Sequence, residues 1–330
     1  MTRERRSAAF VAILIACVAV AGASIALSVV HGRAAAPSDG AAPATRVPGS
    51  GALVFRSLDR ERPGSYGRIA WARAGSSRRP TIGGLACERV YFAAGRGICL
   101  STTGALGRSV RVRILGADLR PRHELELAGV PSRARISPDG RYGTVTAFVA
   151  GHSYADPGSF STQTTIVDMA RGRKVADLED FAVIRDGERF RSIDFNFWGL
   201  TFAPDANTFY ASLGTGGDTY LVRGDLRRRT LVTVRTNAEC PSLSPDGTRV
   251  VYKKRVGQPA AWRYQVLDLS SGRETALAEK RAIDDQAEWL GPDEVLYKAG
   301  EGVWRVPADG SGRPRRFLAA AESPAMLRGD

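Results

Sequence analysis

A four-residue phrase recurs along this chain of 330 residues, each time between two apolar stretches. It reads Ser-Pro-Asp-Gly at 137–140 and 244–247, with the altered copies Ala-Pro-Asp-Ala at 203–206 and Gly-Pro-Asp-Glu at 291–294. Proline presets φ at the second position, aspartate suits the third and glycine suits the last, so the phrase is typical of a type I turn. An apolar run precedes each copy and an alternating run follows, so each copy predicts a strand–turn–strand unit.

A second pattern follows each of these units: an apolar strand, a turn of Gly, Asp or Ser with Arg, and another strand. It occurs at 164–178, 219–234, 264–279 and 302–318, and without an upstream partner at 67–82 and 111–126. The turns that begin at 203, 244 and 291 are 41 and 47 residues apart. Four short strands in about 40–45 residues indicate a propeller blade. The sequence therefore predicts an all-β, six-bladed β-propeller over residues 51–330. A β-sandwich is the alternative, but it would not repeat the same two hairpins six times.

The net charge of +13 does not indicate nucleic-acid binding. Nearly all basic residues are arginines scattered through turns, and no basic helix or basic patch with interleaved aromatics occurs. Weak attraction to anionic lipid or to a wall polymer fits this charge better.

The N-terminus predicts export. Residues 1–7 are basic, and residues 8–30 contain no charge. As a helix this segment would span roughly 35 Å, enough to cross a hydrocarbon core of about 30 Å. The arginines before it favour a cytoplasmic N-terminus. We therefore expect a single-pass transmembrane anchor in the plasma membrane, a flexible stalk over residues 31–50, and a propeller outside the cytoplasm.

Two alternatives to the anchor remain open. The Ala-Gly-Ala at 21–23 fits a cleavage site, so the segment also fits a signal peptide that releases a secreted protein. The Leu-Ile-Ala-Cys at 14–17 resembles a lipoprotein box in which Cys17 is lipidated. All three interpretations export the chain.

No catalytic constellation or metal site is evident. The three histidines are His31, His123 and His152, and no G-x-S-x-G or H-E-x-x-H motif occurs. His123 is expected on an exposed strand or turn. The Gly-rich stretch at 214–220 joins two predicted strands, so it predicts a hairpin turn and not a phosphate loop. We expect no cofactor.

Export permits a disulfide between Cys87 and Cys99. A two-residue turn at Gly95–Arg96 would set Cys99 opposite Phe92, with Cys87 about 16 Å further along the strand. A bridge therefore requires the chain near Cys87 to bend back. Cys240 is expected as a buried thiol or a thiol at the mouth of the central channel.

Several stretches resemble the TolB-like β-propellers. They are Ser-Pro-Asp-Gly followed by an alternating strand, VLDLSSGRETAL at 266–277, DFNFWGLTFAPD at 194–205 and DDQAEWL at 284–290. The resemblance covers 51–330 and implies the fold, with little indication of function. TolB itself has an α/β domain before its propeller, whereas six blades here account for everything after the stalk. A role in Tol-type translocation is therefore not implied.

Propellers bind ligands at the central channel, where the innermost strands begin. The residues five positions before the four turns are Ser132, Trp198, Glu239 and Gln286, and the predicted site adds polar neighbours and a loop residue: Asn196, Asp284, Asp285 and His152. Three carboxylates so close would repel one another, which predicts an acidic spot for a cationic ligand. The predicted function is non-catalytic binding of another envelope protein or a small ligand. The alternative is a metal-assisted hydrolase or lactonase of the six-bladed type.

Overall fold

The computed structural model describes residues 46–75, 78–104, 108–149, 161–257 and 261–329. Apart from residues 62–64, these belong to one compact unit built from β-strands. The helical content of the described residues is a single 3-10 turn, Leu178–Asp180 (η2). No helix within these ranges is long and apolar enough to span a membrane, and the predicted anchor at 8–30 lies outside them.

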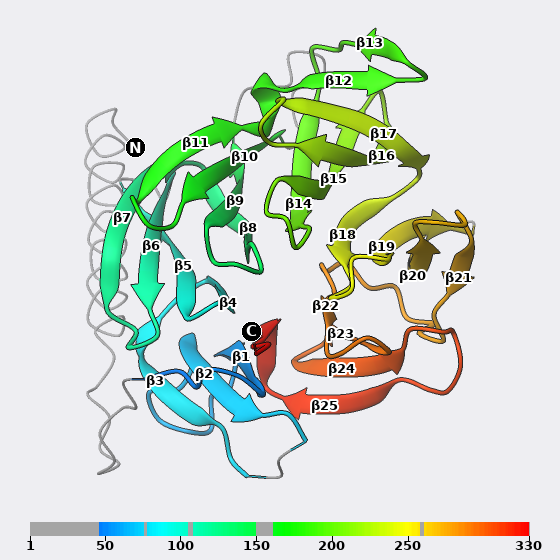
Figure 1. Ribbon diagram of the computed structural model, residues 1–330. Coiled ribbons are helices and arrows are strands. Elements are labelled where there is room, and N and C mark those ends of the chain that lie inside the picture. The colour runs from blue at the N-terminus through cyan, green and yellow to red at the C-terminus, as the bar shows by residue number, and fades with distance from the viewer. Residues whose placement is uncertain (1–45, 76–77, 105–107, 150–160, 258–260, 330) are drawn as a thin grey trace, which may run out of the picture. The chain divides into compact units, whose positions relative to one another are not determined.

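The strands form six sheets around a common centre, which confirms the predicted six-bladed propeller (Figure 1). Four blades contain consecutive strands from the centre outwards. The first two of these contain β4–β7 (Arg89–Ala93, Arg96–Thr103, Ser109–Gly116, Pro121–Ala128) and β8–β11 (Val130–Ile136, Tyr142–Val149, Ser161–Asp168, Arg173–Asp177). The other two contain β18–β21 (Glu239–Leu243, Arg249–Val256, Ala261–Asp268, Glu274–Ala276) and β22–β25 (Glu288–Trp289, Glu294–Ala299, Gly302–Pro307, Arg315–Ala319).

One blade joins the two ends of the described chain. Its sheet has the order β26-β1-β2-β3, with the strands Ala321–Met326, Ala52–Ser57, Arg68–Arg73 and Thr81–Ala86. Leu53 pairs with Met326, and two backbone hydrogen bonds of 2.9 Å link Leu327 to Gly51 and Ala52. The unit at 67–82, which lacks an upstream partner in the sequence, therefore receives its innermost strand from the far end of the chain.

A second blade carries an additional hairpin. Its regular strands are β14–β17 (Asn196–Phe202, Thr208–Thr215, Asp218–Asp225, Thr230–Thr236), and β12 (Ala182–Arg185) and β13 (Glu188–Phe190) extend its outer edge. Strand β12 lies parallel to β17, with Val183 opposite Leu231. Thr215 pairs with Asp218 across Gly216 and Gly217, which confirms the predicted hairpin turn in the Gly-rich stretch.

The repeated phrase forms the turn that joins the innermost strand of a blade to the next. The amide of the last residue donates to the carbonyl of the first in three copies: Gly140 to Ser137 at 2.8 Å, Ala206 to Ala203 at 3.0 Å, and Gly247 to Ser244 at 2.9 Å. Gly247 has φ +73°, a left-handed conformation that a glycine adopts without the steric cost of a Cβ atom. The strand–turn–strand prediction is thus confirmed.

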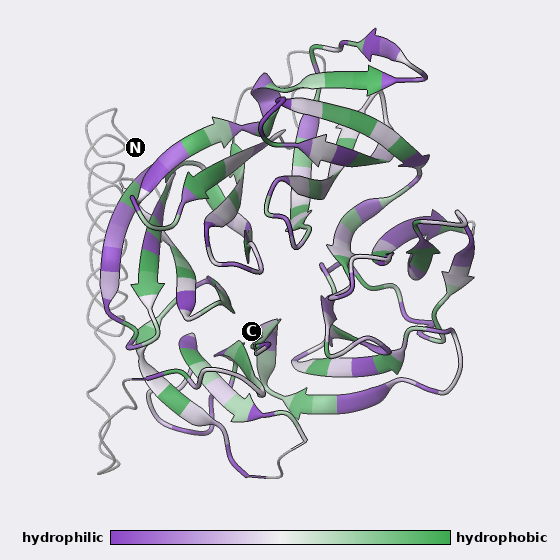
Figure 2. Ribbon diagram, in the orientation of Figure 1, coloured by the Kyte–Doolittle hydropathy of each residue, from purple (hydrophilic) through white to green (hydrophobic). Residues whose placement is uncertain are grey.

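The hydrophobic core lies between adjacent blades, and hydropathy alternates along many strands (Figure 2). Trp289 and Tyr297 of one blade pack with Val251 and Tyr264 of its neighbour. The indole of Trp289 is fully buried and donates to the carbonyl of Ser242 at 2.9 Å, so its polar group is satisfied across the blade boundary. Each such large side chain stabilises the ring by about 1.5–3 kcal/mol when buried.

Cys87 and Cys99 form a disulfide, with Cα atoms 5.4 Å apart. The turn expected at Gly95–Arg96 is wrong by one residue: Ala93 pairs with Arg96, so Cys99 lies opposite Val90. The chain then leaves the sheet, since the amide of Cys87 donates to Gly67 of the neighbouring blade at 2.9 Å. This bend brings Cys87 back to Cys99. Cys240 is a buried free thiol.

The left-handed turn position provides a test of the repeat unit. Gly247→Val is expected to lower the free energy of unfolding by about 1 kcal/mol more than Thr248→Val, because a β-branched residue is strained at positive φ. Residue 248 precedes strand β19, and its side chain makes only an exposed hydrogen bond to Asp246. Urea unfolding of both variants measures the difference. Equal losses would contradict the turn geometry.

Candidate functional site

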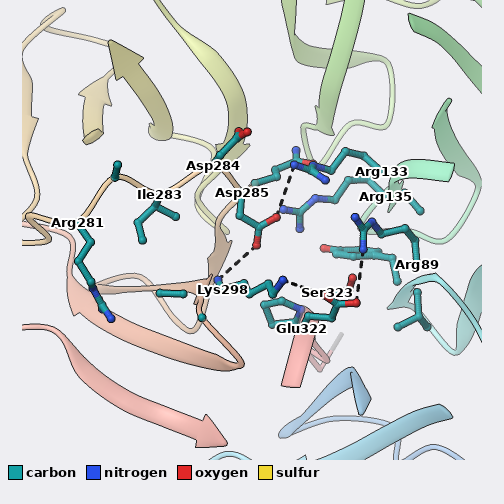
Figure 3. Close-up of a pocket in the computed structure, with 18 residues that line it drawn as sticks. Arg89, Arg133, Arg135, Arg281, Ile283, Asp284, Asp285, Lys298, Glu322 and Ser323 are labelled. Carbon is teal, nitrogen blue, oxygen red and sulfur yellow. Dashed lines mark hydrogen bonds and ion pairs between the residues drawn. The ribbon is translucent and has the colours of Figure 1, made fainter. Parts of the chain in front are cut away.

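A pocket of about 400 Å³ opens at the end of the channel where the innermost strands begin (Figure 3). Its walls come from β4, β8 and β26, from β23, and from the segment that precedes β22. Its volume lies within the range of small-molecule sites. We call this pocket the channel mouth.

The structure brings only some of the predicted site residues to this mouth. Asp284 and Asp285 line it. Glu239 is not among the lining residues: it begins strand β18, is buried, and lies 3.9 Å from the Lys253 amine through its Oε2 atom. Asn196 and Trp198 lie on β14 and are not among the lining residues; Asn196 accepts a hydrogen bond of 2.8 Å from the Thr162 amide. His152 lies outside the described residues.

The two other residues that lie five positions before a repeated turn also have structural contacts. Gln286 is buried in the wall and donates to the carbonyls of Gly199 at 3.0 Å and Pro241 at 2.7 Å, so it links three blades. The carbonyl of Ser132 accepts from Arg89 Nε at 2.8 Å. His123 lies on the outer strand β7, as predicted, with its Nε2 atom 2.9 Å from the carbonyl of Ala170.

The three predicted carboxylates do not form an uncompensated acidic spot, because each has a cationic partner. Lys253 forms an ion pair and hydrogen bond with Asp284. Arg255 Nη2 lies 3.5 Å from Glu239 Oε1, and Arg133 Nη2 lies 3.7 Å from Asp285 Oδ1. Part of this positive charge comes from Lys253 and Arg255 on β19, the second strand of its blade. The predicted carboxylates came only from positions near the innermost strands.

The same contacts shift the pKa values of Glu239 and Asp284 in opposite directions. Burial raises the pKa of Glu239, and Lys253 and Arg255 only partly oppose it. Burial acts in the same direction on Asp284, but the hydrogen bond and charge of Lys253, together with the charges of Arg133 and Arg255, outweigh it and lower the pKa of Asp284. Lys253 thus stabilises the charge of Asp284 more than that of Glu239.

A further carboxylate at the mouth, Glu322, was missed by the sequence analysis. The phrase Glu-Ser-Pro-Ala-Met at 322–326 repeats Glu-Cys-Pro-Ser-Leu at 239–243, and this signal was available. The second residues, Ser323 and Cys240, share a left-handed conformation with φ of 52° and 50°. The later copy lies on β26, which pairs with β1 from the start of the propeller and is not joined to it by a repeated turn, so the turn pattern does not include it.

Glu322 lies at the centre of a cluster of cations. Its carboxylate is 2.6 Å from Arg56 Nη1, 3.2 Å from Lys298 Nζ and 3.5 Å from Arg89 Nη1. Burial opposes ionisation, but Arg89, Lys298 and Arg56 together outweigh it and lower the pKa of Glu322. Glu322 pairs with Arg56 across β26 and β1 just as Glu239 pairs with Lys253 across β18 and β19.

An ionic cluster closes the inner end of the mouth. Glu288 forms a buried ion pair with Arg135, accepts from Arg328 Nη2 at 2.9 Å, and accepts from the Tyr91 hydroxyl at 3.2 Å. The Arg135 guanidinium also lies 4.7 Å from the centroid of the Tyr91 ring. Tyr91 and Arg135 line a second pocket of about 380 Å³ on the other side, next to the prolines of the repeated turns, so they lie between the two pockets.

Within the ranges that the structure describes, no group of three or more His, Cys, Asp or Glu side chains is placed to hold a metal ion. Asp284 and Glu322 of the mouth, and the buried Glu239 nearby, contact ammonium and guanidinium groups instead. The arrangement is suited to binding a charged group by hydrogen bonds and ion pairs.

These features define a six-bladed β-propeller with a charged pocket at one end of its channel. No family model and no curated protein matches the sequence. The fold is similar to that of TolB from Acinetobacter baumannii, with a TM-score of 0.61 and 15% identity over 83% of this chain and 66% of that one. This chain thus spans just under two thirds of that protein's length.

Two further solved structures have a similar fold. The putative TolB from Agrobacterium tumefaciens has a TM-score of 0.51 and 10% identity over 82% of this chain and 90% of that one. A chain of a nidogen/laminin complex has a TM-score of 0.52 and 11% identity over 84% and 99%. At these identities the likeness establishes a TolB-like propeller fold.

The two equivalent glutamates should respond differently to neutralisation. Glu322→Gln is expected to lower stability at pH 7 by roughly 1–2 kcal/mol, because it removes a charged acceptor from the mostly buried Arg56 and from the partly exposed Arg89 and Lys298. Glu239→Gln should cost less, because burial already disfavours its charge. Thermal unfolding of the two variants and the wild type measures this.

The pH dependence provides the control. A carboxyl whose folded pKa is lowered contributes stability above its unfolded pKa and loses it as pH falls through the folded pKa. The gap between wild type and Glu322→Gln should therefore narrow as pH falls below about 4.5. A gap that does not change with pH would show that the charge of Glu322 is not what stabilises the fold.

Proposed function

We propose that this chain is an exported binding propeller, anchored in the plasma membrane by residues 8–30 with its N-terminus inside. It captures another envelope protein or a small ligand at the channel mouth and carries out no chemistry of its own. The pocket is the observation that carries this proposal, because its charged side chains face an open volume of ligand size.

Two further observations support the proposal. The N-terminal sequence combines a basic start with 23 uncharged residues, a pattern that directs export. One of the propellers with a similar fold was solved in a nidogen/laminin complex, which shows that this architecture occurs in a protein complex. The partner of the present chain is not implied by that likeness.

Membrane attachment has a direct test. We expect the full chain to fractionate with membranes and to retain residues 8–30, because that segment is long enough to span the bilayer. N-terminal sequencing and mass spectrometry of the purified protein give the result. A mature N-terminus at Ser24 would indicate a cleaved signal peptide, and a lipid on Cys17 would indicate a lipoprotein.

Capture at the mouth is tested by filling the pocket without changing its charge. Ala282 is an exposed lining residue, so Ala282→Trp should obstruct the mouth and reduce partner recovery in a pull-down from native membranes. Ala128→Trp, at the exposed end of the outer strand β7, is the matched control. Equal recovery with both variants would exclude the mouth as the capture site.

A further inference from the structure

Two arginines from neighbouring blades converge in the channel mouth (Figure 3). Arg89 begins β4 and Arg133 lies on β8. Both donate to the same oxygen, the carbonyl of Ser132, from Arg89 Nε at 2.8 Å and from Arg133 Nη1 at 3.1 Å. The shared acceptor holds two guanidinium groups close together.

Among the residues that the structure describes, no carboxylate lies at hydrogen-bonding distance from either arginine. Arg89 lies 3.5 Å from Glu322, and Arg133 lies 3.7 Å from Asp285. Glu322 also forms ion pairs with Arg56 and Lys298, at 2.6 and 3.2 Å. On this side of the mouth four cationic groups therefore share two carboxylates.

The surplus of positive charge remains accessible. The Arg89 and Arg133 side chains are 32% and 21% exposed, and both line the pocket. Burial and the neighbouring charge of Arg133 lower the pKa of Arg89. Burial also disfavours the charge of Arg133, but nearby Asp285 and Asp284 help to outweigh it and raise the pKa of Arg133, so Arg89 is the less neutralised of the two. An anion between the two groups would relieve this repulsion.

We propose that Arg89 and Arg133 form an oxyanion subsite of the mouth, which takes a carboxylate or phosphate group of the bound ligand. Paired guanidinium groups match the planar or tetrahedral arrangement of such oxygens. This inference rests on the proposed binding function and specifies the ligand's charge, which is opposite to the one that the sequence predicted.

Other lining residues define what surrounds the anion. The Ser323 hydroxyl lines the same pocket and makes no hydrogen bond within the described ranges, and its residue holds a left-handed φ of 52°. Val90, Ile283 and Pro324 add apolar wall. The subsite therefore suits an oxyanion attached to a small apolar group.

The test uses the full chain in a neutral detergent and isothermal titration calorimetry at constant ionic strength. Inorganic phosphate and acetate are titrated separately. Arg133→Gln should weaken binding about tenfold or more, the loss of one charge-assisted hydrogen bond. Arg228→Gln, which removes the same charge from an 82% exposed side chain on the β16–β17 turn, should stay within about twofold.

A variant with the opposite expectation guards against loss by misfolding. Asp285→Asn removes a carboxylate that competes for Arg133 but keeps an oxygen for the Lys298 amide, which donates to Asp285 at 3.3 Å. It should strengthen anion binding several-fold. Weaker binding by Asp285→Asn, or equal weakening by Arg133→Gln and Arg228→Gln, would overturn the proposal.

The two anions distinguish the source of the group. Stronger binding of phosphate would indicate a phosphorylated ligand. Stronger binding of acetate, and of a short peptide with a free carboxyl terminus over its amidated form, would indicate a carboxylate of a partner. If neither anion binds while Ala282→Trp still blocks partner capture, the oxyanion subsite is wrong and the proposed binding function stands.

Discussion

The pairing of β26 with β1 is the contact on which the rest of the ring depends. Every blade buries its faces against two neighbours, so the core is complete only when the last strand closes the first blade. In the three blades where the phrase ends in a hydrogen-bonded turn, that turn joins the innermost strand to the second. In the closing blade, the two hydrogen bonds of Leu327 stand where the covalent turn would be.

Closure also builds the channel mouth. Glu322 and Ser323 reach the mouth only because β26 lies innermost in its blade, and Arg328 just after it reaches Glu288 at the inner end. The charges of the site therefore come from opposite ends of the described chain. Opening the ring would separate Glu322 from Arg56 and Arg89 and leave those cations without their shared carboxylate.

The fold could be predicted from the sequence because the same turn residues recur in successive blades. Proline, aspartate and glycine at fixed offsets report local backbone conformation, which a single sequence reveals. The disulfide register could not be obtained in this way, since it depended on a positive φ at Ala94 and a bend at Cys87. A shift of one residue was enough to misplace Cys99.

The candidate site was predicted less well, for a physical reason. The positions before the repeated turns identified carboxylates near the innermost strands. The sign of the local charge, however, depends on long side chains that extend from other strands and blades. Lys253 comes from the second strand of its own blade, and Arg133 comes from a blade far away in sequence. Only their positions in space show that the carboxylates are already neutralised.

A single difference between repeats explains the surplus of positive charge. Lys253 and Lys298 occupy equivalent places in Val-Val-Tyr-Lys and Val-Leu-Tyr-Lys, and Arg56 pairs with Glu322 as Lys253 pairs with Glu239. The blades of Lys253 and Arg56 have a glutamate at this place, Glu239 and Glu322. The blade of Lys298 has the neutral Gln286 instead, five residues before its turn, as Glu239 is before its own. Lys298 therefore contacts Glu322 of the closing blade, which already serves Arg56. Glu322 contacts Arg56, Lys298 and Arg89, and one carboxylate does not neutralise three cations. The side of the mouth near Arg89 therefore has a net positive charge.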